Sequence, residues 1–215
     1  MAVIDVTILT PFYLITNHLM SWRGTTVLDP TTSLDLAIPF MAWTVVIYLS
    51  LFYLFYPLPL ISMPGNKRGR HEALIMSQSL IVLFIISNTW FVICPAEVHI
   101  RSQAFDNVDT MHPVFLAMFE GLWLMDEPYN AWPSLHVSSA LLFTLFAIRW
   151  WKGKPVLQLA VGIWWVLMSL SILTTKQHFI LDLITGALVI WPIWTWYVQP
   201  ALDRLDIQSS DEAVS

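Results

Sequence analysis

The sequence predicts an all-α protein built as a bundle of membrane-spanning helices. Of its 215 residues, 57% are hydrophobic and only 12% are charged, whereas a soluble domain carries about 25% charged residues. Five apolar runs approach or exceed the roughly 20 residues that a helix needs to cross a bilayer. Basic residues concentrate in two of the loops between these runs, as they do in the cytoplasmic loops of membrane proteins.

Charge and cysteine content exclude several other classes of protein. The formal net charge is −5 with ten Lys and Arg residues, so a nucleic-acid partner is not expected. The single cysteine, Cys94, excludes an intrachain disulfide and a cysteine-rich zinc or iron–sulfur site. The expected surroundings are therefore the membrane, and the sequence indicates no oligomeric state.

The first apolar run, Val3–Trp22, is the weakest candidate for a span. Its polar or helix-breaking residues are Asp5, Pro11, Asn17 and His18. The run either crosses the membrane as a sixth helix or lies in the interface as an amphipathic helix. No basic residue precedes it, so we do not expect a cleaved signal peptide. We assign residues 1–34 to this helix and an outer loop.

Five stronger spans follow. They are Ala37–Met63, Ala73–Cys94, Leu135–Ile148, Pro155–Leu173 and Phe179–Val198. The third is short, but Trp150 and Trp151 can end it at the interface, where aromatic residues gather. Residues 35–198 therefore form the membrane domain, and we expect residues 199–215 to form a polar, frayed tail on the cytoplasmic side.

The basic residues predict the orientation of the bundle. Six of the ten occupy the loops after the first and third strong spans; they are Lys67, Arg68, Arg70, Arg149, Lys152 and Lys154. Alternate crossings place both loops on one side, which the positive-inside rule makes cytoplasmic. The segment 96–132 then lies outside with six acidic residues and the single basic residue Arg101. Within it, the apolar stretch Pro113–Trp123 is too short to span, and we expect a short interfacial helix there.

Polar side chains are costly at the edge of an apolar span, and two such clusters lie on the outer side. The first is the stretch 130–136, which reads NAWPSLH and contains Ser134 and His136. Pro133 favours the first turn of a helix, whose free N–H groups would face an anion together with Ser134 and His136. The alternatives are that Ser134 only caps the helix and that His136 is an ordinary interfacial residue.

The second cluster is the stretch 174–182, where His178 and Asp182 are four residues apart. At that spacing two residues share a helix face. A carboxylate on one imidazole nitrogen fixes the tautomer and leaves the other nitrogen as a nucleophile or base. The pair also suits an interhelical polar clamp or part of a metal site.

The two clusters together resemble the type 2 phosphatidic acid phosphatase/haloperoxidase superfamily. In that family a Pro-Ser-x-His motif and a His-x-x-x-Asp motif face each other at the membrane surface. Here the first motif ends at His136 and the second begins at His178, about forty residues later. The resemblance covers roughly residues 35–198, so the membrane domain is expected to be the catalytic domain.

The chain departs from the common family pattern in two places. The usual first motif, Lys-x6-Arg-Pro, is absent, and Arg101 is the one Lys or Arg in the segment that takes its place. The Arg that usually precedes the second histidine by six residues is replaced by Ile172. Lys176 follows about one helical turn later, and we expect it to supply the missing charge. These departures resemble the branch that includes inositol phosphorylceramide and sphingomyelin synthases.

The resemblance implies phosphoryl transfer through a phosphohistidine, with no cofactor and no metal ion. His178 would attack phosphorus, Asp182 would orient His178, and His136 would protonate the leaving alkoxide. The phosphate oxygens would be held by Ser134, Lys176 and Arg101.

Three functions remain open at this point. We favour an integral-membrane lipid phosphatase whose active site faces the periplasm from a bacterial inner membrane. A lipid phosphotransferase differs from it only in the acceptor, which is a lipid alcohol instead of water. A non-catalytic membrane scaffold or transporter is the alternative from another class, and the intact residues His136, His178 and Asp182 weigh against it.

Overall fold

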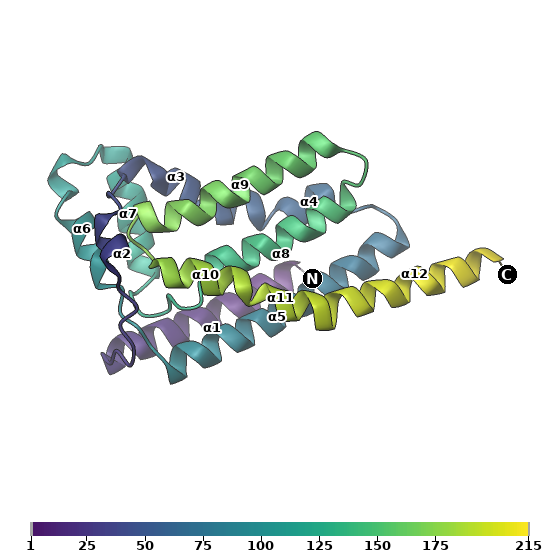
Figure 1. The fold of residues 1–215 in the computed structure, drawn as a ribbon, viewed down its shortest axis with the longest axis horizontal. Helices are drawn as coiled ribbons and strands as arrows, with labels where there is room; N and C mark the ends of the chain where they lie inside the picture. Colours follow the sequence, from purple (N-terminus) through teal and green to yellow (C-terminus); the bar gives the residue numbers. More distant parts are fainter. Residues whose placement is uncertain (1, 215) are drawn as a thin grey trace.

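The computed structural model describes residues 2–214, with side chains described for residues 9–207. Within this part of the chain the regular elements are helices, joined by one isolated bridge between Ala96 and Asn130. Figure 1 shows an elongated bundle whose helices run along its long axis. The predicted all-α class is confirmed.

Three helical stretches are long and apolar enough to cross a membrane. They are α5 (Lys67–Ile93), α9 (Pro155–Thr174) and the stretch Ile180–Ile207. This stretch consists of α10 (Ile180–Leu188), α11 (Ile190–Ile193), the π-helical η5 (Trp194–Val198) and the start of α12 (Gln199–Val214). The tail expected to be frayed is therefore helical from Gln199 to Val214. Large apolar side chains such as Leu60, Leu159 and Trp196 are exposed, as expected for surfaces that face lipid instead of water. Another predicted span, α8 (Leu135–Trp150), has 16 residues. The number of crossings therefore stays a prediction.

The predicted first strong span is not one regular helix. It consists of η1 (Ala42–Thr44), α3 (Val45–Tyr48), the π-helical η2 (Leu51–Phe55) and α4 (Leu58–Ser62). Tyr56 N–H reaches five residues back to the Leu51 carbonyl at 2.9 Å, which is the wider π spacing. Pro57 follows and has no N–H to continue the ladder. Composition alone did not reveal these interruptions.

The N-terminal run forms a single helix, α1 (Ala2–Arg23), which lies along α5 (Figure 1). Its polar residue Asn17 is buried and exchanges two hydrogen bonds with the backbone of Glu127, at 2.8 and 2.7 Å. These bonds give a polar group inside an apolar helix its partners. They also fasten α1 to the C-terminal part of the loop formed by residues 96–132, which we call the outer loop.

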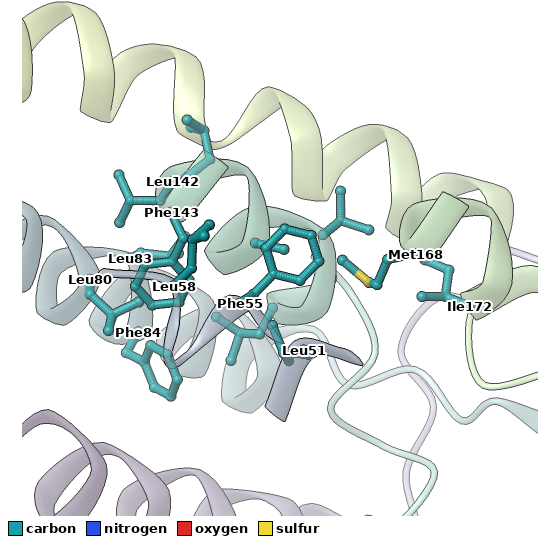
Figure 2. Close-up of a cluster of buried hydrophobic side chains, with 14 of the residues drawn as sticks. Leu51, Phe55, Leu58, Leu80, Leu83, Phe84, Leu142, Phe143, Met168 and Ile172 are labelled. Atoms are coloured by element: carbon teal, nitrogen blue, oxygen red, sulfur yellow. The ribbon is translucent and has the colours of Figure 1, made fainter. Parts of the chain in front are cut away.

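The core of the bundle lies where the broken segment meets α5, α8 and α9. Figure 2 shows Phe55 and Leu58 against Leu83 of α5 and Phe143 of α8, with Met168 of α9 beyond them. Lipid tails are as apolar as these side chains, so close packing and its dispersion energy, more than removal from water, hold such helices together.

The two ends of the bundle differ in content. The two basic loops meet at one end, where Glu72 of α5 binds both Arg68 and Arg149, as their predicted place on one side requires. The opposite end carries α2 (Ser33–Ala37), α6 (Ser102–Phe105) and α7 (Pro113–Met125) (Figure 1). A helix thus covers the stretch predicted to be interfacial, and its place at a membrane interface stays a prediction.

Candidate active site

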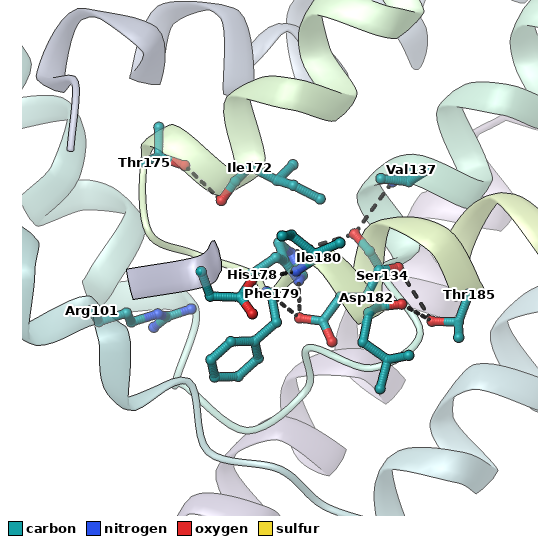
Figure 3. A network of polar contacts seen from close by, with 12 residues as sticks. Arg101, Ser134, Val137, Ile172, Thr175, His178, Phe179, Ile180, Asp182 and Thr185 are labelled. Atoms are coloured by element: carbon teal, nitrogen blue, oxygen red, sulfur yellow. Dashed lines mark hydrogen bonds and ion pairs between the residues drawn. The ribbon is translucent and has the colours of Figure 1, made fainter. Parts of the chain in front are cut away.

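His178 and Asp182 form the pair expected from their spacing, but not along a helix face. His178 precedes α10, whose first residue is Ile180. Asp182 Oδ2 accepts a hydrogen bond from the Phe179 N–H at 2.8 Å and lies 3.2 Å from His178 Nδ1. The same carboxylate therefore binds the start of the helix and orients the imidazole, which leaves Nε2 facing away from it (Figure 3).

Ser134 lies on the open side of that imidazole. It is the N-cap of α8, and its Oγ accepts from the Val137 N–H at 3.4 Å while lying 3.5 Å from His178 Nε2. Helix α8 begins at Leu135, so Pro133 precedes the cap instead of occupying the first turn as predicted. The Ser134 hydroxyl thus caps α8 and also lies close to His178.

A close helix crossing brings the two motifs together. A Cβ added at Gly186 of α10 would lie 2.7 Å from the Ser134 carbonyl oxygen, so no larger residue fits without a shift. One turn earlier, the Asp182 carbonyl accepts from the Ser134 N–H at 3.2 Å. Backbone contact between α10 and the start of α8 therefore sets the distance between Ser134 and His178.

His136 is the second imidazole of the site. Its ring centroid lies 5.5 Å from that of His178 and 4.4 Å from that of Tyr48 in α3. The ring is buried, and Nε2 has no hydrogen-bond partner. The unpartnered Nε2 of His136 thus belongs to a ring beside His178, whose own Nε2 faces Ser134, an arrangement that suits one nucleophile and one proton donor.

Arg101 approaches from the outer loop and is buried. Its guanidinium donates to the Asp126 carboxylate at 3.0 Å and to the Asp126 carbonyl at 2.5 Å, and Tyr13 of α1 donates to the same carboxylate at 2.5 Å. The Arg101 Nε has no partner. In Figure 3 the guanidinium points toward the polar network. The predicted salt bridge to a loop carboxylate therefore exists without removing Arg101 from the site.

The Lys176 side chain binds backbone carbonyls of the segment around α2. Its ammonium donates to the carbonyls of Asp35, at 2.8 Å, and Ile38, at 2.5 Å, and its backbone turns left-handed with φ of 60°. Burial lowers the pKa of this ammonium from its ordinary value, an effect that the Asp35 carboxylate partly offsets. The same carboxylate accepts from the Ile180 N–H at 2.7 Å. Lys176 thus ties the segment around α2 to the start of α10, and its predicted role at the phosphate stays untested.

Three side chains of this site were not among the sequence candidates. Tyr48 lies in an apolar run without a motif, Tyr13 in the weakest span, and Asp126 among six acidic loop residues. Only their contacts with Arg101 and His136 distinguish them. Beside them, a cavity of about 300 Å³ is lined by Arg101, Asp126 and other residues of the outer loop.

Among the described residues, no three His, Cys, Asp or Glu side chains gather in a way that could hold a metal ion. Metal independence stays a prediction that a chelator can test.

Comparison with known proteins identifies one family. A family model described as the PAP2 superfamily matches residues 18–196, a range that contains both motifs, Arg101 and Tyr48. Neither the curated proteins nor the solved structures include a match.

Proposed function

The chain belongs to the PAP2 superfamily, and we propose that it is an integral-membrane lipid phosphatase that works through a phosphohistidine. The family supports a phosphatase or phosphotransferase chemistry, and apolar helices fit a membrane protein. The observation that carries the proposal is the geometry of His178, with Nδ1 on Asp182 and Nε2 beside Ser134 at 3.5 Å.

In the first half of the reaction, His178 Nε2 attacks the phosphorus of the lipid phosphate. The N–P bond forms as the bond from phosphorus to the lipid oxygen breaks. The positive charge that develops on the imidazole is stabilised by the Asp182 carboxylate, which accepts a hydrogen bond from the Nδ1–H group. His136 gives a proton to the leaving alkoxide, a contribution of about 10²–10⁴-fold in rate.

The second half regenerates the enzyme. His136, now neutral, accepts a proton from a water molecule as the water oxygen attacks the phosphohistidine. The N–P bond breaks, inorganic phosphate leaves, and His178 is free again. During both halves Arg101 and Ser134 face the anionic oxygens, where fixed positive charge and hydrogen-bond donors lower the barrier most.

The site is proposed to open to the outer face of the membrane. It lies at the end of the bundle opposite the Glu72 cluster and the two basic loops, which the positive-inside rule places in the cytoplasm. In a bacterium this end faces the periplasm. A lipid phosphate of the outer leaflet then enters sideways, and its charged headgroup never crosses the apolar core.

The test is activity of the purified protein on a panel of lipid phosphates and diphosphates, with and without EDTA and a lipid alcohol. We expect phosphate release that survives EDTA and is absent in His178→Ala. Transfer of the phosphorus-containing group to the alcohol without phosphate release would replace the phosphatase by a phosphotransferase. No turnover of any lipid phosphate would favour the scaffold or transporter.

A further inference from the structure

The hydroxyl of Tyr48 is buried without a partner. The side chain is 0% exposed, and its oxygen makes no hydrogen bond. Buried polar atoms are almost always hydrogen-bonded, and those that are not are expected to serve another purpose. Packing alone would be served equally well by phenylalanine, so the oxygen requires an explanation.

The surroundings of this hydroxyl indicate what it binds. The Tyr48 ring lies against His136, with centroids 4.4 Å apart and planes 32° apart, and the His136 ring in turn lies 5.5 Å from that of His178. His136 Nε2 and Arg101 Nε are also buried without partners. Three polar atoms from three separate segments are thus unsatisfied at this end of the bundle.

These three atoms share one capacity. A tyrosine hydroxyl, an arginine Nε–H and a protonated imidazole all donate hydrogen bonds. A transferring phosphoryl group spreads negative charge over three oxygens and needs several donors. The Arg of the common motif is Ile172 here, and the ammonium of Lys176 is bound to two carbonyls. The site therefore has a place for a further donor.

We infer that the Tyr48 hydroxyl donates a hydrogen bond to the phosphoryl group of the substrate, next to Arg101. Its ring meanwhile holds the imidazole of His136 in place. The inference rests on the proposed function, because it concerns the same site, and it adds a substrate-contacting residue that neither motif contains. The competing role is packing against His136 alone.

The test is Tyr48→Phe, which removes one oxygen and keeps the ring. Vanadate serves as the phosphate mimic, and its affinity is measured by direct binding and by inhibition. A hydrogen bond to a charged group is worth enough for about 10- to 100-fold in affinity, so we expect a loss of that size. The matched control is Tyr56→Phe, eight residues later in the same segment, whose ring contacts Phe52 and Phe143 instead.

Thermal stability separates the two roles of Tyr48. Removal of an unpartnered buried hydroxyl leaves no other group unsatisfied, so Tyr48→Phe should melt no lower than the wild type. An unchanged vanadate affinity, or a lower melting temperature with normal affinity, would overturn the inference. If His178→Ala is inactive in the same preparation, the proposed function survives that result. If the wild-type protein neither binds vanadate nor releases phosphate, both the proposed function and the inference about Tyr48 are wrong.

Discussion

The two ends of the bundle both bury charged side chains, but they differ in how completely the polar atoms there are hydrogen-bonded. At the end predicted to face the cytoplasm, which we call the inner end, Glu72 accepts from Arg68 and Arg149 at 3.0–3.1 Å and from the Trp150 indole at 2.7 Å. Both carboxylate oxygens are satisfied, and the contacts join α5 to α8.

The opposite end, which we call the outer end, leaves polar atoms without partners. His136 Nε2, Arg101 Nε and the Tyr48 hydroxyl all lack a hydrogen bond, each at a typical cost of about 1–3 kcal/mol. A cluster whose polar atoms are all hydrogen-bonded stabilises the fold, whereas a cluster with unpartnered atoms can bind a ligand. Substitutions at the inner end should therefore act on stability, and substitutions at the outer end on activity.

The largest effect is expected from His178→Ala. Loss of the nucleophile should lower kcat by about 10⁴-fold or more and leave the melting temperature within a few degrees of the wild type. Phosphate release from the best lipid substrate measures it. His71→Ala, at an exposed position of α5, is the control and should retain full activity. Wild-type turnover in His178→Ala would show that His178 is not the nucleophile.

Arg101→Ala should have the next largest effect. Removal of one charge contact in the transition state lowers kcat/KM by about 10²–10³-fold, and vanadate inhibition should weaken in parallel. Stability should fall as well, because Asp126 loses its buried partner. Arg68→Ala provides the comparison from the inner end, where the side chain is 44% exposed; its vanadate inhibition should not change. Equal vanadate inhibition in Arg101→Ala would exclude Arg101 from the phosphate site.

Gly186→Ala tests the helix crossing that unites the two motifs. The added methyl group would push the start of α8 away from α10, and a displacement of about 1 Å in a catalytic site can cost 10²-fold in rate. Overpacking also costs about 1–3 kcal/mol of stability. The control is Gly162→Ala in α9, where an added Cβ meets nothing within 4 Å. If both variants behave alike, the crossing has more freedom than the contact distance implies.

Glu72→Gln should show the opposite pattern at the inner end. The change removes the buried carboxylate that joins the two arginines and leaves them paired with the half-exposed Asp206, so we expect about 2 kcal/mol less stability. The KM and the vanadate inhibition constant should remain those of the wild type. Thermal melting and kinetics of the same sample measure both. A large change in KM with unchanged melting would show that the two ends are coupled, contrary to the comparison.

The smallest perturbation is a pair of cysteines that reports which end faces out. In a Cys94→Ser background, Asp106→Cys should react with an impermeant maleimide in intact cells. Gly65→Cys lies between α4 and α5 with open space around the new Cβ and should react only after lysis. Both variants should keep normal activity. The reverse labelling pattern would invert the bundle and place the site in the cytoplasm.

Much of this protein was determined by the sequence alone. Apolar runs predicted the helices α5, α8 and α9 within a few residues of their bounds, except that α5 begins six residues earlier, at Lys67. Long apolar stretches have one stable solution in lipid, in which each backbone group is bonded within its own helix. The two motifs identified His136, His178 and Asp182, and the family match agrees with the resemblance. Residue type and spacing suffice where a contact is local.

Tertiary structure decided everything that depends on distant segments. Tyr13 reaches Asp126 across 113 residues, and Lys176 reaches Asp35 across 141, so no local pattern predicts either contact. The same holds for Tyr48, which in the sequence is an ordinary aromatic residue of an apolar run and which only the folded structure places against His136. Spacing placed His178 and Asp182 on a helix face, but the helix begins after His178. The carboxylate stabilises that start through the Phe179 N–H, because the first N–H groups of a helix need an acceptor that only a side chain can supply.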